Sequence, residues 1–270
     1  MKKLLCLMLM CFSFAATAWC QTPTENKAMN VGEDLTYDLY FNWKFVWIKC
    51  GQAFMKTTST TYEKQKALRT YLITTGNKKA DRFFVMRDTL TSIISEKMVP
   101  FYYQKSAMEG KHYTVEKVWY KYSGGKTTNN LWYKNKHGDI RTNTNTTTKE
   151  VYDMISMLSR ARSWDARTLK PGQKIKFLMA EGKHVSEQTI IYRKKEVIKA
   201  NNDVKYNCLK LSFVEYDEKG KEHEIVTFFV TDDDNHLPVR LDLYLRFGSA
   251  KAFLTSVKNQ KHPITAIVSK

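Results

Sequence analysis

The chain has 270 residues, of which 43% are hydrophobic and 26% are charged, and this composition excludes a disordered or collagen-like chain. The mean hydropathy of −0.48 argues against a helical protein with several membrane spans. The net charge of +17 suggests nucleic-acid binding, but the basic residues are spread along the chain and form no dense tract. We therefore expect no nucleic-acid partner.

The first twenty residues have the features of a secretory signal peptide. Lys2 and Lys3 form a basic start, and the apolar stretch 4–18 is short for a bilayer span and ends in small residues. Cleavage after Ala18 or after Cys20 fits, and we prefer the second site; the alternative is an uncleaved anchor. The sequence predicts an exported protein, periplasmic or envelope-associated in a Gram-negative bacterium, without a transmembrane span after cleavage.

Cleavage after Cys20 would leave two cysteines, Cys50 and Cys208. An oxidising compartment would allow a disulfide between them. Both also lie in apolar, strand-like surroundings, where a free thiol serves as a small hydrophobic side chain. The sequence leaves both possibilities open.

After an expected linker over 21–30, the chain begins a long alternation of apolar and other residues. A period of two is typical of a strand with one buried face. The same phase continues past Gly51, which we interpret as a bend or bulge in one very long strand or in a hairpin. The apolar positions are Leu35, Tyr37, Leu39, Phe41, Trp43, Phe45 and Trp47.

Shorter strands are expected through the middle of the chain, separated by turn signals such as Gly124-Gly125 and Glu181-Gly182. Neighbours joined by short turns must pair antiparallel. We expect a helical turn near 79–84 and a loop over 142–149. The strand candidates are Tyr71–Thr75, Thr89–Ser95, Phe101–Met108, Tyr113–Tyr122, Asn130–Lys134, Lys174–Ala180, Gln188–Arg193, Cys208–Tyr216, Glu224–Thr231 and Ala252–Val257.

One segment, Glu150–Arg162, has helical spacing of its apolar residues. Thr148 is the expected N-cap, and Glu150 suits the first turn. A second strong alternation follows near the end of the chain, before a C-terminal tail over 259–270. Its apolar positions are Leu237, Val239, Leu241, Leu243, Leu245 and Phe247.

These elements predict a mainly β fold with one domain over 31–258. We expect a single curved antiparallel sheet, a half-barrel or open barrel, braced by one central amphipathic helix. The alternation of apolar residues shows that one face of the sheet is buried, but not what covers that face. A second packed sheet, or lipid around an outer-membrane barrel, would give the same pattern; the uneven strand lengths and the amphipathic helix favour the braced half-barrel.

No recognisable catalytic set, metal-ligand spacing or cofactor fingerprint occurs in the sequence. The acidic run 232–236 lacks the central glycine and terminal glutamate of a calcium loop, and it suits a turn between two strands. We therefore expect no catalytic residues, metal or cofactor, and a protein that is not an enzyme.

Three blocks of the sequence resemble a known family when they are taken in order. They are Gly32–Tyr37 with Gly51–Ala53, Tyr152–Leu158 with Arg162, and Val230–Asp234 with Leu237–Arg240. Together they resemble the bacterial domain of unknown function 3108 (DUF3108), over roughly residues 31–258. The resemblance implies an exported, mostly β protein with no established activity. More distantly, the plan resembles the half-barrel of periplasmic lipoprotein carriers.

The alternation of large apolar residues leads us to expect binding or scaffolding of a hydrophobic or lipid-like partner. A module that contacts glycans or the envelope through aromatic residues and positive charge is the alternative, and a hydrolase with an unfamiliar site comes third. The candidate ligand-facing or core residues are Trp43, Phe45, Trp47, Met154, Leu158, Leu241, Leu243 and Leu245.

Overall fold

The computed structural model describes residues 21–43, 46–201, 203–245 and 248–269. The expected signal peptide and Phe45 lie outside these residues. The strands are β1 (Asp34–Trp43), β2 (Val46–Tyr62), β3 (Gln65–Gly76), β4 (Met86–Ser95), β5 (Pro100–Glu109), β6 (His112–Ser123), β7 (Lys126–Lys134), β8 (Ile140–Thr147), β9 (Val151–Tyr152), β10 (Lys174–Ala180), β11 (Val185–Lys199), β12 (Lys205–Tyr216), β13 (Glu222–Thr231), β14 (Pro238–Leu245), β15 (Gly248–Lys258) and β16 (Ile267–Ser269).

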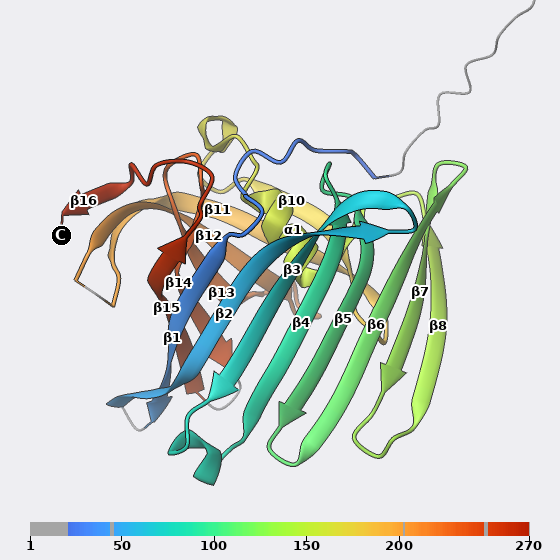
Figure 1. Cartoon of the computed structure of the whole chain (residues 1–270), viewed down its shortest axis with the longest axis horizontal. Coiled ribbons are helices and arrows are strands. Elements are labelled where there is room, and N and C mark those ends of the chain that lie inside the picture. Colours follow the sequence, from blue (N-terminus) through green and yellow to red (C-terminus); the bar gives the residue numbers. More distant parts are fainter. Residues whose placement is uncertain (1–20, 44–45, 202, 246–247, 270) are drawn as a thin grey trace, which may run out of the picture.

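All sixteen strands belong to one sheet, in the order β8-β7-β6-β5-β4-β3-β2-β1-β15-β14-β13-β12-β11-β10-β9, with β16 beside β12. Pairing is antiparallel except between β9 and β10. The sheet bends so that β1–β8 and β10–β15 face each other, and helix α1 (Met154–Ala161) lies between them near one end (Figure 1). This confirms the predicted half-barrel braced by one helix. Among the described residues, no helix has the length and apolar character needed to cross a membrane.

The first alternating segment is a hairpin and not one continuous strand. Trp43 at the end of β1 pairs with Val46 at the start of β2, and Trp47 pairs with Asn42. Paired residues lie on the same face of a sheet. Trp47 therefore shares a face with Asn42, the face that points away from the core, although the alternation predicted the core face. The predicted irregularity at Gly51 is confirmed, because the β1–β2 register shifts next to it.

The remaining predictions differ from the structure mainly at element ends. Helix α1 is capped by Asp153 and not by Thr148: the Asp153 carboxylate accepts hydrogen bonds from Ile155 N at 3.0 Å and Ser156 N at 2.8 Å. The expected helical turn is the 3₁₀ turn η1 (Ala80–Arg82), and a second, η2 (Ala166–Thr168), follows α1. The stretch 142–149, predicted as a loop, largely forms edge strand β8.

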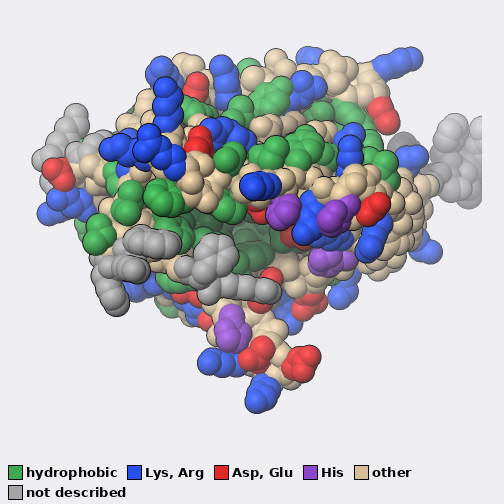
Figure 2. Space-filling view, turned by 90° about the horizontal axis from the view of Figure 1, so that it is seen from below, with side chains coloured by type: hydrophobic (Ala, Val, Ile, Leu, Met, Phe, Trp, Pro, Cys, Tyr) green, Lys and Arg blue, Asp and Glu red, His purple; other side chains and the backbone are tan. Residues whose placement is uncertain are grey.

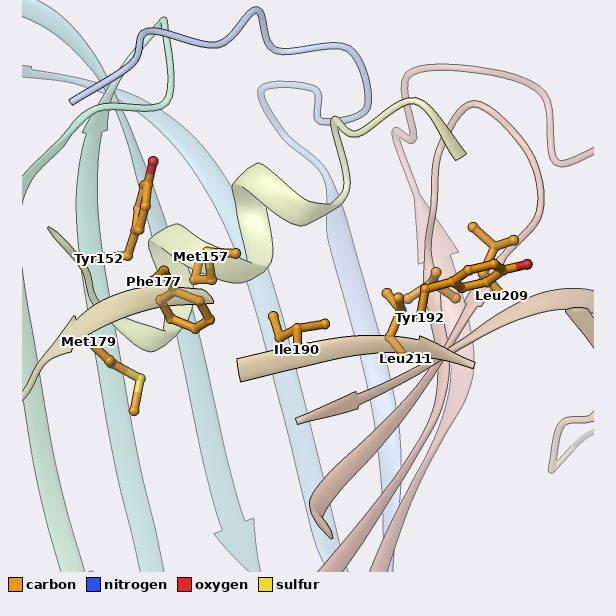
Figure 3. Close-up of a cluster of buried hydrophobic side chains, with 9 residues drawn as sticks. Tyr152, Met157, Phe177, Met179, Ile190, Tyr192, Leu209 and Leu211 are labelled. Atoms are coloured by element: carbon orange, nitrogen blue, oxygen red, sulfur yellow. The ribbon is translucent and has the colours of Figure 1, made fainter. Parts of the chain in front are cut away.

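Helix α1 closes one end of the half-barrel, which we call the upper end. Its buried side chain Met157 and the preceding Tyr152 pack onto β10, β11 and β12 (Figure 3). Beside Trp164 the structure leaves a void of about 10 Å³, too small for more than one water. The other members of this cluster are Phe177, Met179, Ile190, Tyr192, Leu209, Leu211 and Val230.

A buried ion pair ties the upper end together. The Arg162 guanidinium, after α1, donates to the Glu33 carboxylate at 2.5 and 2.8 Å and to the Asn235 carbonyl oxygen at 3.1 Å. Both charged side chains are 1% exposed. The pair therefore joins the helix, the start of β1 and the β13–β14 turn.

The segments before and after the predicted domain also belong to the fold. The segment 21–30, expected as a linker, buries Gln21, Ala28 and Met29 and crosses the upper end (Figure 1). The expected tail contributes β16, which pairs with β12, and the buried Ala266.

Candidate functional site

The inward face of the sheet becomes progressively more exposed away from α1. On β1, Leu35 is 0% and Tyr37 4% exposed, whereas Leu39 is only half-buried. On β14 and the residue before it, exposure rises from 0% at Leu237 to 41% at Leu245. A completed core would bury such residues equally, so the interior is not filled at the end remote from α1.

This lower end carries the β3–β4 connection and the β5–β6 turn, at the bottom of Figure 1. Viewed from there, the molecule is hollowed, and hydrophobic side chains form much of the wall (Figure 2). We call this feature the hollow. We assign to its wall the half-buried residues that flank the core clusters of the inward face, namely Leu39, Leu72, Phe213, Phe228 and Leu241. We add Leu243, which is half-buried and two residues beyond Leu241 on β14.

Polar groups gather around the β10–β11 turn, beside β6. Gly182 in this turn donates its N–H to the Glu116 carboxylate at 3.3 Å. A Cβ atom at Gly182 would lie 2.6 Å from the Glu116 Cβ atom, so only glycine allows this close approach. A cavity of about 550 Å³ adjoins the turn and is lined by Glu181, His184 and Gln188, among others.

Two acidic groups, Asp88 on β4 and Glu181 at this turn, have raised pKa values. Burial raises the pKa of Asp88 to about 6, and the nearby Glu109 adds to the increase while Lys105 opposes it. Burial likewise raises the pKa of Glu181, with a further contribution from Glu116. A pair of carboxyl groups with opposite roles in acid–base chemistry needs environments that separate their pKa values, whereas these two pKa values shift in the same direction.

The acidic run 232–236 makes hydrogen bonds that stabilise its own turn and the C-terminal segment. The Asp233 carboxylate accepts hydrogen bonds from the Thr231 hydroxyl at 2.7 Å and from Asn235 N at 3.1 Å, and it also accepts from the backbone of Thr265 and Ala266. Across the part of the chain that the structure describes, no group of three or more His, Cys, Asp or Glu residues is placed to hold a metal ion.

The structure brings together only some of the residues singled out in the sequence. Leu241 and Leu158 pack onto the same buried cluster. Leu243 is half-buried and Leu245 is 41% exposed farther along β14. Met154 begins α1 and is 45% exposed, so it is neither core nor part of the hollow. Its position at the first turn directs it away from the buried face of the helix.

Among the aromatic candidates of the first hairpin, Trp47 is the one whose side chain the structure describes. Trp47 lies on the outer face, 38% exposed, with the Lys251 ammonium 4.3 Å from its ring centroid. This cation covers one ring face that a sugar would need for stacking. Trp43 ends β1, and Phe45 lies outside the described residues.

Both cysteines are free thiols, so the disulfide alternative is not realised. Cys208 is buried in a cluster with Phe229 and Val239, and burial raises its pKa to about 12. Cys50 is half-buried in β2, and burial raises its pKa as well. The two residues lie on strands that the sheet order separates by β1, β15, β14 and β13, which explains why they remain unpaired.

Two features were not predicted from the sequence. The polar groups at the β10–β11 turn come from distant parts of the chain, and no sequence signal joins them. The exposed pair Phe83-Phe84 had a usable signal, because two adjacent aromatic residues follow a run rich in Lys and Arg.

The family model of DUF3108, a protein family of unknown function, matches residues 36–255. The chain therefore belongs to this family. No curated protein of established function matches the sequence.

One solved structure shows the same kind of fold at low sequence identity. A β-barrel-like protein of the domain of unknown function DUF1849 from Brucella abortus has 11% identity and a TM-score of 0.52, over 86% of this chain and 99% of its own. A protein from Bacteroides fragilis, described as exported and YmcC-like in fold, has 10% identity and a TM-score of 0.37, over 89% of this chain and 100% of its own.

Proposed function

We propose that this DUF3108 protein is an exported, non-enzymatic binding protein that holds a hydrophobic, lipid-like molecule in the hollow. The observation that carries the proposal is the rise in exposure along the inward face, from fully buried Leu35 and Leu237 to half-buried Leu39, Leu241 and Leu243.

The free-energy argument is based on burial. Covering apolar surface gains about 25 cal/mol per Å², and fully burying one leucine gains about 1.5–3 kcal/mol. Partly exposed leucines that point inward forgo at most about a third of this gain, roughly 0.5–1 kcal/mol each. An acyl chain or similar apolar ligand in the hollow would recover it, because several such side chains converge there.

The site chemistry favours binding over catalysis. Asp88 and Glu181 both have raised pKa values, and neither is paired with a carboxyl group of lowered pKa. Of the aromatic residues that the sequence suggested for glycan contact, Trp47 lies on the outer face, and Lys251 covers one face of its ring. Export to the periplasm or envelope is supported by the basic and apolar N-terminal segment, which precedes the described residues.

The test is binding of a fluorescent fatty acid, together with native mass spectrometry of the protein purified from cells. Leu243→Trp adds bulk inside the hollow, so we expect it to weaken probe binding at least about tenfold and to remove co-purifying lipid. Ile73→Trp is the matched control, because Ile73 is 42% exposed on the other face of β3, and it should bind the probe like the wild type.

Two results would contradict the proposal. One is a protein that carries no lipid from cells and does not bind the probe. The other is equal probe binding by the Leu243→Trp variant and the wild type, because binding would then occur outside the hollow.

A further inference from the structure

The β3–β4 connection, residues 77–85, presents an exposed aromatic pair at the lower end (Figure 1). Phe83 is 91% exposed, more than any other large hydrophobic residue among those the structure describes as exposed, and Phe84 is 51% exposed. Exposing two adjacent phenylalanine side chains to water is unfavourable. Such a feature is typical of an interaction site.

Hydrogen bonds hold the connection in one conformation. The Asn77 side-chain oxygen accepts from Lys79 N at 3.0 Å and from Ala80 N at 2.9 Å, and its amide nitrogen donates to the Lys49 carbonyl oxygen at 2.8 Å. Phe83 N and the next backbone N–H both donate to the Ala80 carbonyl oxygen at 2.9 Å. The outward direction of Phe83 is therefore fixed by the backbone of the loop.

The β5–β6 turn supports the second ring. A Cβ atom at Gly110 would lie 3.3 Å from the Phe84 ring, and Gly110 N donates to the Val85 carbonyl oxygen at 2.8 Å. Phe84 thus rests on the protein while Phe83 projects beyond it.

Positive charge surrounds the projecting ring. Lys78, Lys79 and Arg82 are exposed, and no ion pair between described residues includes them. The only acidic residue of the loop, Asp81, is already paired with Arg87. The loop therefore combines a protruding apolar group with three available cations.

We propose that residues 77–85 bind the surface of an anionic lipid bilayer. Phe83 would enter the boundary between head groups and acyl chains, while Lys78, Lys79 and Arg82 contact lipid phosphates. Apolar side chains flanked by basic residues bind in this way, with contributions from both apolar burial and attraction to anionic lipid. Charge complementarity selects a bilayer over a neutral apolar partner, and the proposal does not depend on a ligand in the hollow.

The test is sedimentation of the purified protein with vesicles of phosphatidylcholine alone or mixed with phosphatidylglycerol. We expect binding to the mixed vesicles that weakens with salt. Phe83→Ser should weaken it at least about tenfold. The variant Lys78→Gln/Lys79→Gln/Arg82→Gln should weaken it roughly a hundredfold, since each cation near an anionic surface contributes about fivefold.

Matched controls alter similar groups elsewhere on the surface. Val197 is 52% exposed, and Val197→Ser should bind mixed vesicles like the wild type. Lys64→Gln/Lys66→Gln/Lys126→Gln removes three exposed cations near the β2–β3 and β6–β7 turns, at the end remote from Phe83. It should reduce binding far less than the loop variant does.

Three outcomes would overturn the proposal. The first is wild-type protein that binds neither kind of vesicle, because a bilayer would then not be the partner of Phe83. The second is equal binding by the Phe83→Ser variant and the wild type. The third is equal loss with both triple charge variants, which would indicate a general effect of net charge. Fatty-acid binding by Phe83→Ser, measured separately, shows whether the hollow still works.

Discussion

Replacing Arg162 by methionine should lower the free energy of unfolding more than replacing an exposed arginine by methionine. The Arg162 guanidinium donates to both Glu33 carboxylate oxygens, at 2.5 and 2.8 Å, and to the carbonyl oxygens of Asn235 at 3.1 Å and Ala28 at 3.4 Å. Because both charged side chains are 1% exposed, water cannot replace the lost partner.

The expected loss follows from leaving Glu33 without a counter-charge. Removing one partner of a buried ion pair costs about 3–5 kcal/mol, so Arg162→Met should lower the free energy of unfolding by about that amount. Glu33→Gln should cost less, since an amide oxygen still accepts one hydrogen bond from Arg162. Combining Arg162→Met with Glu33→Leu should cost less than the sum of the single losses, because neither charge is then left alone.

The assay is urea unfolding followed by tryptophan fluorescence. Arg167→Met is the control, since Arg167 is 90% exposed and paired only with Asp165 near the surface, and its unfolding curve should match the wild type. A loss below about 1 kcal/mol for Arg162→Met, or strictly additive losses in the double variant, would refute the role given to the buried pair.

Three further predictions concern single groups. Burial raises the pKa of Asp153 from 3.8 to about 6. The stability that protonated Asp153 contributes is therefore fully present below pH 3.8 and is lost as pH rises through about 6. Asp153→Asn keeps a capping oxygen and should reduce the change of Tm with pH; an unchanged pH dependence would contradict this. Gly182→Ala should lower Tm and expose the β10–β11 turn to protease, because its Cβ would meet Glu116; wild-type resistance would show that the turn is not docked. A thiol reagent should modify half-buried Cys50 in the folded protein and buried Cys208 only after unfolding, whereas a mass two hydrogens lower would reveal a disulfide.

Alternation identified the sheet because burial of one face leaves a direct record in the sequence. Strand β14 lies within the predicted segment, although its burial alternates only in part: Val239 is buried, but so is Asp242, and Leu245 is exposed. Strand β8 was missed for the converse reason: it is an edge strand of Asn, Thr and Arg residues that is largely exposed on both faces, so its sequence has no apolar period. Strand β9 has two residues, too few for any periodic signal.

The hollow could be anticipated only in part. Alternation assigned Leu241 and Leu243 to the inward face, but it carries no information on whether another layer covers them. The β1–β2 turn shows a second limit, since pairing of Trp43 with Val46 moves Trp47 to the outer face although the apolar pattern continues unbroken. The Arg162–Glu33 pair joins residues far apart in the sequence, and only the folded chain shows it.

The upper end of the half-barrel is packed and the lower end is open, and this difference explains how the hollow can stay open. A sheet with half-exposed leucines inside would gain free energy by collapsing. Collapse would require the two halves of the sheet to approach each other. Helix α1 and the hydrogen-bonded ion pair of Arg162 and Glu33 hold the halves apart at the upper end. The hollow can therefore stay open without support from the lower end. Because Phe83 lies at that same lower end, a bilayer bound there would face the mouth of the hollow, and an apolar ligand could pass between them with little exposure to water.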